Sequence, residues 1–77
     1  MKTLHITGWR PGLDKVALTK TIRSHTGFGL AEAKRCTDDV VENKPVVFRG
    51  LRSSDADAFL TDVRSIGAVA EVSEELS

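Results

Sequence analysis

The chain has 77 residues, of which 40% are hydrophobic and 29% are charged, with 11 basic and 11 acidic side chains. These ordinary values exclude a disordered or fibrous chain and predict one globular domain covering residues 1–77. No stretch approaches the roughly 20 apolar residues of a membrane span, no leader precedes the first residues, and one cysteine cannot form an internal disulfide, so we expect a cytoplasmic protein.

The zero net charge hides a split between the two halves of the chain. Residues 1–36 hold seven Lys or Arg and two Asp or Glu, whereas residues 37–77 hold four and nine, so the halves carry about +5 and −5. Such a split favours a polar surface with one basic and one acidic region that can steer a partner, although charge also falls unevenly by chance in a short chain.

The first residues predict a strand followed by a turn. Residues 2–7 alternate polar and apolar side chains, which is typical of a half-buried strand. The sequence GWRPG at residues 8–12 predicts a turn that presents Trp9 and Arg10 at its tip.

Two helices are predicted next. Helical spacing covers residues 14–26, with Asp14 placed to favour the N-terminus and Gly27 placed to end the helix in the left-handed conformation. The second helix is predicted over residues 30–41. The apolar face that we expect to point inward comprises Leu30, Ala33, Thr37 and Val40.

The second half of the chain predicts a strand and a third helix. Residues 44–49 favour a strand, and Pro45 near its beginning indicates the edge of a sheet. Residues 53–67 favour a helix in which Ser54 and Asp57 fit a capping box. Its inward stripe is Phe59, Val63 and Ile66, with Gly67 as the stop.

A final strand over residues 68–73 completes the fold, and the acidic tail at 74–77 is expected to fray. The order β-α-α-β-α-β predicts an α+β, two-layer sandwich with three helices on one face of a three-stranded sheet. The helical crossover makes the second and third strands parallel, so the simplest sheet has the order 2-1-3 with the first strand antiparallel to both neighbours. The other face, left to water or to a partner, carries Thr3, His5, Thr7, Val69 and Glu71.

Two glycines surround Phe28 in the sequence TGFGLAEAK at residues 26–34. Gly27 ends one helix, and Gly29 lets the chain reverse into the next helix within two residues. A phosphate-binding loop is a poor match, because such loops follow a strand and Glu32 replaces the third glycine of GxGxxG. The stretch therefore predicts the corner of a helical hairpin.

The first helix has two faces of different chemistry. Its inward face is predicted to comprise Leu18, Thr21, Ile22 and His25. On the opposite face an aliphatic residue stands among cations, in the set Lys15, Val16, Thr19, Lys20 and Arg23. This pattern predicts a docking patch, while isolated exposed apolar residues are also common on solvated faces.

No set of residues assembles a nucleophile, a base and an oxyanion site. His5 is expected on a sheet surface, His25 at the inward end of a helix, and Cys36 as a small buried hydrophobe. The acidic run at residues 38–42 is typical of a solvated helix end, and no His or Cys spacing indicates a metal. We therefore expect a non-enzymatic protein with no metal, cofactor or small-molecule substrate.

The segment DKVALTKTIRSHTGFGLAEAK, residues 14–34, resembles the helical hairpin of the C-terminal domain of the bacterial ribosomal stalk protein, L-seven/L-twelve. The shared pattern is Lys-Val, then Lys, Arg, Thr-Gly-x-Gly-Leu and Glu-Ala-Lys. The later GLRSSDADAFLTDVRSIGAVAEV resembles the remainder of that domain, so the similarity covers about residues 2–73. The resemblance implies the fold predicted above and a surface on the first two helices that recruits translational GTPases.

The resemblance also implies which residues contact the partner. By position they are Lys15, Val16, Lys20, Arg23, Gly27, Gly29 and Lys34. Two residues depart from the family pattern: Thr19, which we keep in the candidate surface, replaces an aliphatic residue, and Ala31 stands where lysine is frequent. The loop with Trp9 and Arg10 is longer than usual and is a secondary candidate surface.

The stalk protein also has an N-terminal dimerisation segment and a hinge, whereas this chain begins almost directly on its first strand, so we expect a free-standing domain. The expected function is docking of a protein partner, a translational GTPase or another protein, through the first hairpin. The alternative is an inhibitor, immunity-type or adaptor protein on the same fold that binds a cognate toxin or protease. Nucleic-acid binding is less favoured, because the chain is neutral and offers no aromatic stacking platform. No membrane partner is expected.

Overall fold

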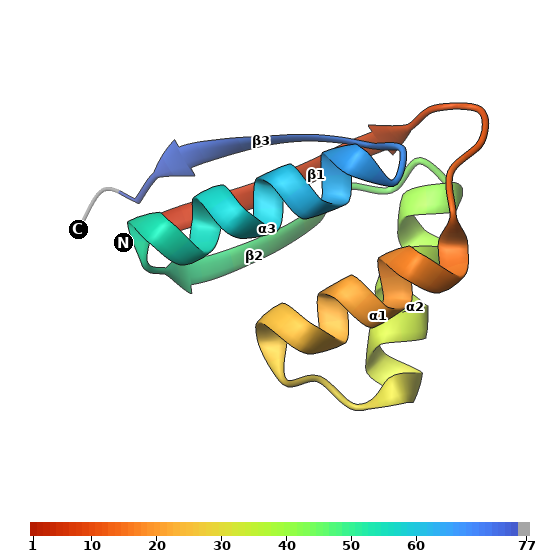
Figure 1. Cartoon of the computed structure of the whole chain (residues 1–77), viewed down its shortest axis with the longest axis horizontal. Helices are drawn as coiled ribbons and strands as arrows, with labels where there is room; N and C mark the ends of the chain where they lie inside the picture. The colour runs from red at the N-terminus through yellow and green to blue at the C-terminus, as the bar shows by residue number, and fades with distance from the viewer. Residues whose placement is uncertain (76–77) are drawn as a thin grey trace.

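A computed structural model describes residues 1–75 of the chain (Figure 1). The predicted order of elements is confirmed. The elements are β1 (Lys2–Trp9), α1 (Lys15–Thr26), α2 (Leu30–Val41), β2 (Val46–Leu51), α3 (Ser53–Ser65) and β3 (Ala68–Glu74). No helix in the described part of the chain has the length and apolar character needed to cross a membrane.

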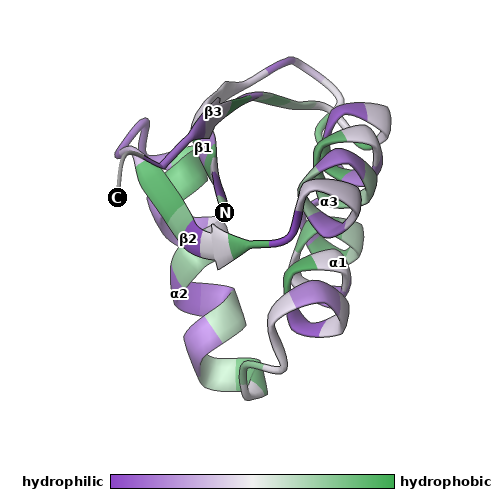
Figure 2. Ribbon diagram, turned by 90° about the vertical axis from the view of Figure 1, so that its left-hand side faces the viewer, coloured by the Kyte–Doolittle hydropathy of each residue, from purple (hydrophilic) through white to green (hydrophobic). Residues whose placement is uncertain are grey.

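The three strands form one sheet in the predicted order β2-β1-β3, with β1 antiparallel to both neighbours. Alternation along β1 turns Leu4 and Ile6 toward the helices, and both side chains are fully buried. Figure 2 shows α1 and α3 lying on the same side of the sheet. The fold is therefore the predicted α+β sandwich.

The core lies between the sheet and the helices. Its buried side chains are Leu4, Ile6, Leu18, Ile22, Ala33, Val40, Val46, Phe48, Phe59, Val63, Ala68 and Ala70. The rings of Phe48 and Phe59 are 5.1 Å apart between centroids, and Phe28 lies 6.1 Å from Phe48. Phe28 therefore holds the hairpin corner against the core by a tilted aromatic contact, with 47° between the planes of the two rings.

β1 is longer than the sequence predicted. It continues to Trp9 through a shift in its pairing with β3 between Ile6 and Gly8. Trp9 thus ends a strand, and its indole N–H donates a hydrogen bond to the carbonyl of Val41 over 3.1 Å, so its placement at the tip of a turn was wrong. A glycine inside a strand often marks a bulge or a shift in strand pairing, as Gly8 does here. The interpretation of GWRPG as a turn overlooked this possibility.

Two boundaries in the second half also differ from the prediction. β2 begins at Val46, after the proline, and remains an edge strand as expected. α3 begins at Ser53 with Arg52 at the N-cap position and no side-chain capping hydrogen bond, so the capping box at Ser54 and Asp57 was wrong. Both residues lie inside the helix, two positions later than a capping box on this helix requires.

The sheet face opposite the helices is only partly open. Its exposed residues include Thr7, Val69 and Glu71, as predicted, and His5 is half-buried. Thr3 differs, because only 5% of its surface is exposed.

The cover over Thr3 is the carboxylate of Glu75. The Thr3 hydroxyl donates to this carboxylate over 3.0 Å, and the backbone N–H of Gly50 donates to the same oxygen. The backbone N–H of Glu75 donates to the carbonyl of Met1 over 3.1 Å. The prediction of a frayed tail was therefore wrong for Glu74, which ends β3, and for Glu75, while positions 76–77 lie outside the described residues.

Candidate functional site

α1 and α2 form the predicted helical hairpin. The carboxylate of Asp14 accepts a hydrogen bond from the Ala17 N–H over 3.0 Å, which caps the start of α1. Gly27 ends α1 with φ of 75°, and its N–H donates to the Arg23 carbonyl over 2.9 Å. Because this left-handed conformation favours glycine, the predicted role of Gly27 is confirmed. Gly29 precedes α2 in an extended conformation.

A groove of about 410 Å³ runs between the two helices; we call it the α1–α2 groove. The residues that line it are Lys15, Val16, Thr19, Lys20, Arg23, Leu30, Lys34, Thr37 and Asp38. Val16 is 66% exposed and Leu30 is 50% exposed, so each helix contributes one open aliphatic side chain. The structure thus brings together all the predicted contact side chains of the two helices.

The remaining candidates lie outside the groove. Gly27 and Gly29 form the hairpin corner, and a β-carbon at either position would meet no heavy atom within 4 Å other than those of its own residue and chain neighbours. Trp9 is 39% exposed and contacts the carboxyl end of α2 through Val41. The backbone N–H of Arg10 donates to the Gly67 carbonyl over 2.8 Å.

Two residues of the hairpin differ from the prediction in their exposure. Thr19, predicted to point outward, is only 8% exposed, and Leu30, predicted to point inward, is open to the groove. Helical periodicity predicts the direction in which each side chain points around the helix axis. The packing of the neighbouring helix decides which of these directions are buried. Leu30 is therefore the groove residue that sequence reasoning missed; its position directly after the glycine corner was the available signal.

The floor of the groove is a pair of threonines, one from each helix. The hydroxyl oxygens of Thr19 and Thr37 lie 2.7 Å apart, and either can donate to the other. Thr19 also contacts the Lys15 carbonyl at 3.0 Å, and Thr37 the Ala33 carbonyl at 3.2 Å. Each hydroxyl therefore has a hydrogen-bond partner within the hairpin, so an apolar group can lie above the pair without leaving a side-chain polar atom unpaired.

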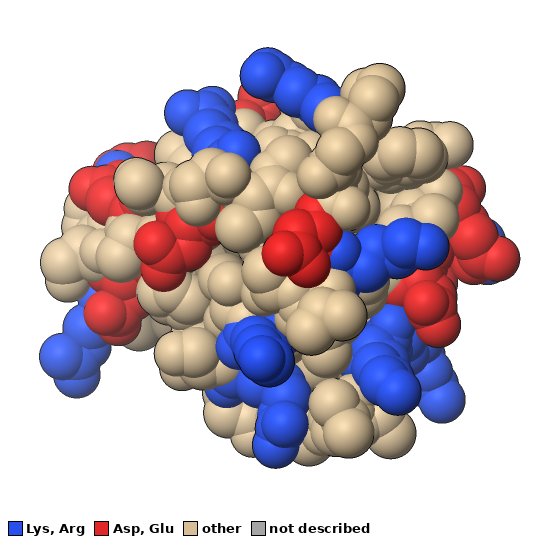
Figure 3. All heavy atoms as spheres, turned by 45° about the vertical axis from the view of Figure 1, so that its right-hand side comes forward, with Lys and Arg blue, Asp and Glu red and all other residues tan. Residues whose placement is uncertain are grey.

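The cations around the groove have no acidic partners. The contacts within 4.0 Å between a basic nitrogen and a carboxylate oxygen among residues 1–75 are His25 with Asp62 at 2.8 Å and Lys44 with Glu42 at 3.4 Å. None of Lys15, Lys20, Arg23 and Lys34 therefore has a carboxylate oxygen within 4.0 Å in the described chain. Figure 3 shows basic side chains gathered over the lower part of the molecule, where Figure 1 places the hairpin. These four cations therefore produce a positive electrostatic potential at the solvent-exposed edge of the groove.

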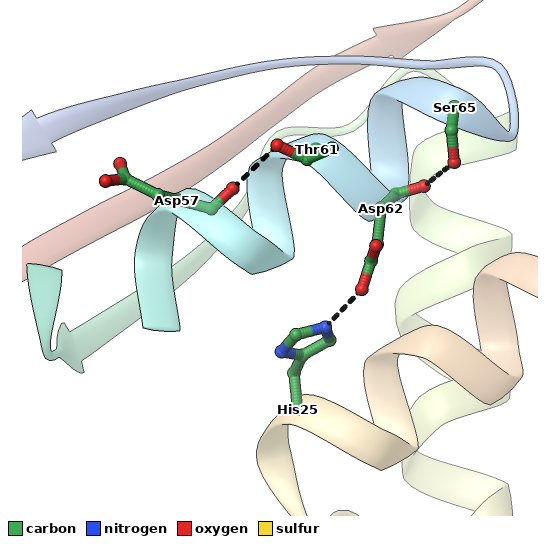
Figure 4. A network of polar contacts seen from close by, with 5 residues as sticks. All are labelled: His25, Asp57, Thr61, Asp62 and Ser65. Carbon is green, nitrogen blue, oxygen red and sulfur yellow. Dashed lines mark hydrogen bonds and ion pairs between the residues drawn. The ribbon is translucent and has the colours of Figure 1, made fainter. Parts of the chain in front are cut away.

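His25 joins α1 to α3. Its ring stacks on Phe59 at 4.5 Å with 4° between the planes, and its Nε2 lies 2.8 Å from the Asp62 carboxylate (Figure 4). The Ser65 hydroxyl donates to the backbone carbonyl of Asp62 over 2.7 Å. His25 is therefore half-buried between two helices, as its inward position predicted.

Neither His5 nor Cys36 lies in the α1–α2 groove. The Nε2 of His5 lies 2.8 Å from the Ser73 hydroxyl on the open sheet face. Burial raises the pKa of the Cys36 thiol, and the carboxylates of Asp39 and Glu32 raise it further. A protonated thiol is a weak nucleophile. Within residues 1–75 no cluster of three or more His, Cys, Asp or Glu side chains could hold a metal ion.

Together these features define a class of protein, a small α+β domain that presents a helical hairpin with an apolar groove edged by cations. The family model of the ribosomal protein L7/L12 C-terminal domain matches residues 6–73, so the chain belongs to that family.

Curated relatives carry the name large ribosomal subunit protein bL12. The proteins of Pasteurella multocida and Sodalis glossinidius are each 40% identical to this chain over 62 residues, and that of Buchnera aphidicola is 39% identical over 62 residues. Each alignment covers 79% of this chain and 48% of the relative. The chain thus spans about half the length of the curated relatives that it matches.

Proposed function

We propose that the protein binds a protein partner, a translational GTPase, through the α1–α2 groove and acts in translation without catalysing a reaction. The observation that carries the proposal is the pairing of exposed Val16 and Leu30 with four cations that lack acidic partners in the described chain. Membership of the L7/L12 C-terminal domain family and relatives named as ribosomal proteins support it.

Binding combines two effects with different ranges. The cations attract an acidic surface over about 8 Å at physiological ionic strength and so raise the rate of association. Burial of Val16 and Leu30 supplies short-range free energy, about 1.5–3 kcal/mol for each fully buried aliphatic side chain. The satisfied hydroxyls of the floor add no desolvation cost, because no buried side-chain polar atom in residues 1–75 lacks a partner.

The test measures the affinity of the purified chain for purified elongation and initiation GTPases by calorimetry. Val16→Asp places a charge among apolar contacts, and Lys20→Glu reverses a steering charge, so each should weaken binding at least about tenfold. The matched controls are Val69→Asp, an exposed valine on the opposite sheet face, and Lys44→Glu, an exposed lysine outside the groove. Both controls should bind like the wild type.

Two outcomes would overturn the proposal. The first is that no purified translational GTPase binds the wild-type chain, which would favour the inhibitor or adaptor alternative. The second is that the groove variants and the control variants bind equally well, which would move the contact surface away from the hairpin.

A further inference from the structure

We propose that the α1–α2 groove accepts its partner segment in one direction, with an acidic end at the hairpin corner and a basic end beside Asp38. The segment is an amphipathic helix of a protein partner. The inference rests on the proposed docking function and adds to it the charge order of the partner.

The contact between Thr19 and Thr37 divides the groove in two. Along α1, Lys20 and Arg23 follow Thr19 toward the hairpin corner, and along α2, Lys34 precedes Thr37 on the same side. Three cations therefore lie on the corner side of the crossing, with no carboxylate among the residues that line that half. This half attracts only an acidic end of the partner.

The other half of the groove has a different charge. Asp38 lines it opposite Lys15, and no Lys or Arg nitrogen in the described chain lies within 4.0 Å of its carboxylate. The groove continues here into a shallower hollow that adds Arg35 and two further carboxylates, from Asp39 and Glu42. Lys15 and Arg35 thus lie beside three carboxylates in this hollow. One of the three, Glu42, also pairs with Lys44 at 3.4 Å.

The backbone of α2 adds a partial negative charge at this end, where the side chains of Lys15, Arg35 and Lys44 balance the three carboxylates. α2 ends at Val41, and its last turn contains no basic side chain. The carboxyl end of a helix carries a partial negative charge, so Asp38 and its neighbours are placed where carboxylates destabilise a helix slightly. Asp38 and Asp39 have no ion pair within the described chain, whereas a partner cation would meet both their carboxylates and the helix end.

The size of the groove fits a helical segment. A volume of about 410 Å³ accommodates a few side chains, as when an amphipathic helix lays its apolar stripe in a hydrophobic groove. Val16 lies on the Asp38 side of the crossing and Leu30 on the corner side, so aliphatic contact is available in both halves. Opposite charges at the two ends then fix the direction of the helix.

The probes are two synthetic helical peptides with the same aliphatic stripe. The bipolar peptide carries glutamates at one end and lysines at the other, and the acidic peptide carries glutamates at both ends. Calorimetry compares the wild type with Asp38→Lys, and with Asp57→Lys on α3 as a control of equal charge change outside the groove. Relative to that control, Asp38→Lys should weaken the bipolar peptide and strengthen the acidic peptide, each about two- to fivefold.

Direction is measured with a nitroxide label on the acidic end of the bipolar peptide. The label should broaden the amide resonances of Gly27 and Gly29 and leave that of Asn43, beyond the end of α2, sharp. Equal broadening at both ends, equal effects of Asp38→Lys and Asp57→Lys, or failure of both peptides to bind would each overturn the inference. The proposed function is tested separately by the affinities for the GTPases. Lys20→Glu can weaken GTPase binding whether or not the peptides bind in one direction.

Discussion

At the scale of single residues, the threonine pair decides the shape of the groove. Thr19 and Thr37 are short, branched side chains, and their hydroxyls meet at 2.7 Å between two helices. Three oxygen contacts, one between the hydroxyls and one from each hydroxyl to a carbonyl of its own helix, share only two hydroxyl protons. At any moment the pair can therefore make two of these three hydrogen bonds. A polar residue at position 19 is thus accommodated inside the hairpin, where the outward prediction did not place it.

We expect Thr19→Val and Thr37→Val each to lower the free energy of unfolding by about 1 kcal/mol, because each removes one hydrogen bond and leaves the partner oxygen facing a methyl group. The double variant should cost less than the sum, since it removes both polar groups and keeps their shape. Urea denaturation of the four proteins measures this. Thr61→Val, which removes a comparable hydroxyl on an exposed helix surface, is the control. Strictly additive losses would contradict the pairing.

At the scale of elements, α1 is held at both ends by different contacts. Asp14 caps its start, and His25 near its end stacks on Phe59 and bonds Asp62 of α3. Periodicity predicted α1 and α2 to within one residue of their observed bounds, because their apolar spacing and the Gly27 stop agree. The end of β1 was missed, because its last residues pair with β3, which is distant in sequence. The start of α3 was missed because its N-cap residue, Arg52, makes no side-chain capping hydrogen bond.

His25→Ala should lower the free energy of unfolding by about 1–3 kcal/mol, since it removes an aromatic stack and a hydrogen bond between α1 and α3. His25→Phe keeps the stack and should recover about half of that loss. Thermal unfolding followed by circular dichroism measures both. If His25→Phe is as unstable as His25→Ala, the stack on Phe59 contributes nothing, and the joint rests on Asp62 alone.

At the scale of the whole molecule, Glu75 ties the end of the chain to its beginning. Its carboxylate receives hydrogen bonds from Thr3 of β1 and Gly50 of β2, and its N–H bonds the carbonyl of Met1. Glu75, which directly follows β3, thus contacts both β1 and β2. The acidic residues at 74–77 predicted a frayed tail, because their local sequence does not indicate that donors as distant as Thr3 and Gly50 bind the Glu75 carboxylate.

The Gly50 N–H, and then the Thr3 hydroxyl, hold the pKa of Glu75 below the ordinary value of 4.5. The folded state therefore binds this proton more weakly than the unfolded state does. The carboxylate contributes stability above the unfolded pKa, and this contribution is lost as the pH falls through the folded pKa. Glu75→Gln should accordingly flatten the loss of stability on acidification below about pH 5.

Urea denaturation at a series of acidic pH values measures this dependence, with Glu71→Gln on the exposed sheet face as the control. The control should keep the wild-type slope of unfolding free energy against pH. An unchanged slope in Glu75→Gln would show that the contacts of Glu75 do not persist in solution.

The sequence by itself determined the order of elements, the topology of the sheet, the hairpin corner and the set of cations on one side of α1. These follow from local periodicity, from glycine conformations and from the handedness of connections, all of which are written in neighbouring residues. Only the tertiary structure decided that Thr19 is covered, that Leu30 opens into the groove, that Trp9 meets α2 and that Glu75 closes the sheet. Each of these depends on which distant surface packs against the residue, and no local pattern encodes that choice.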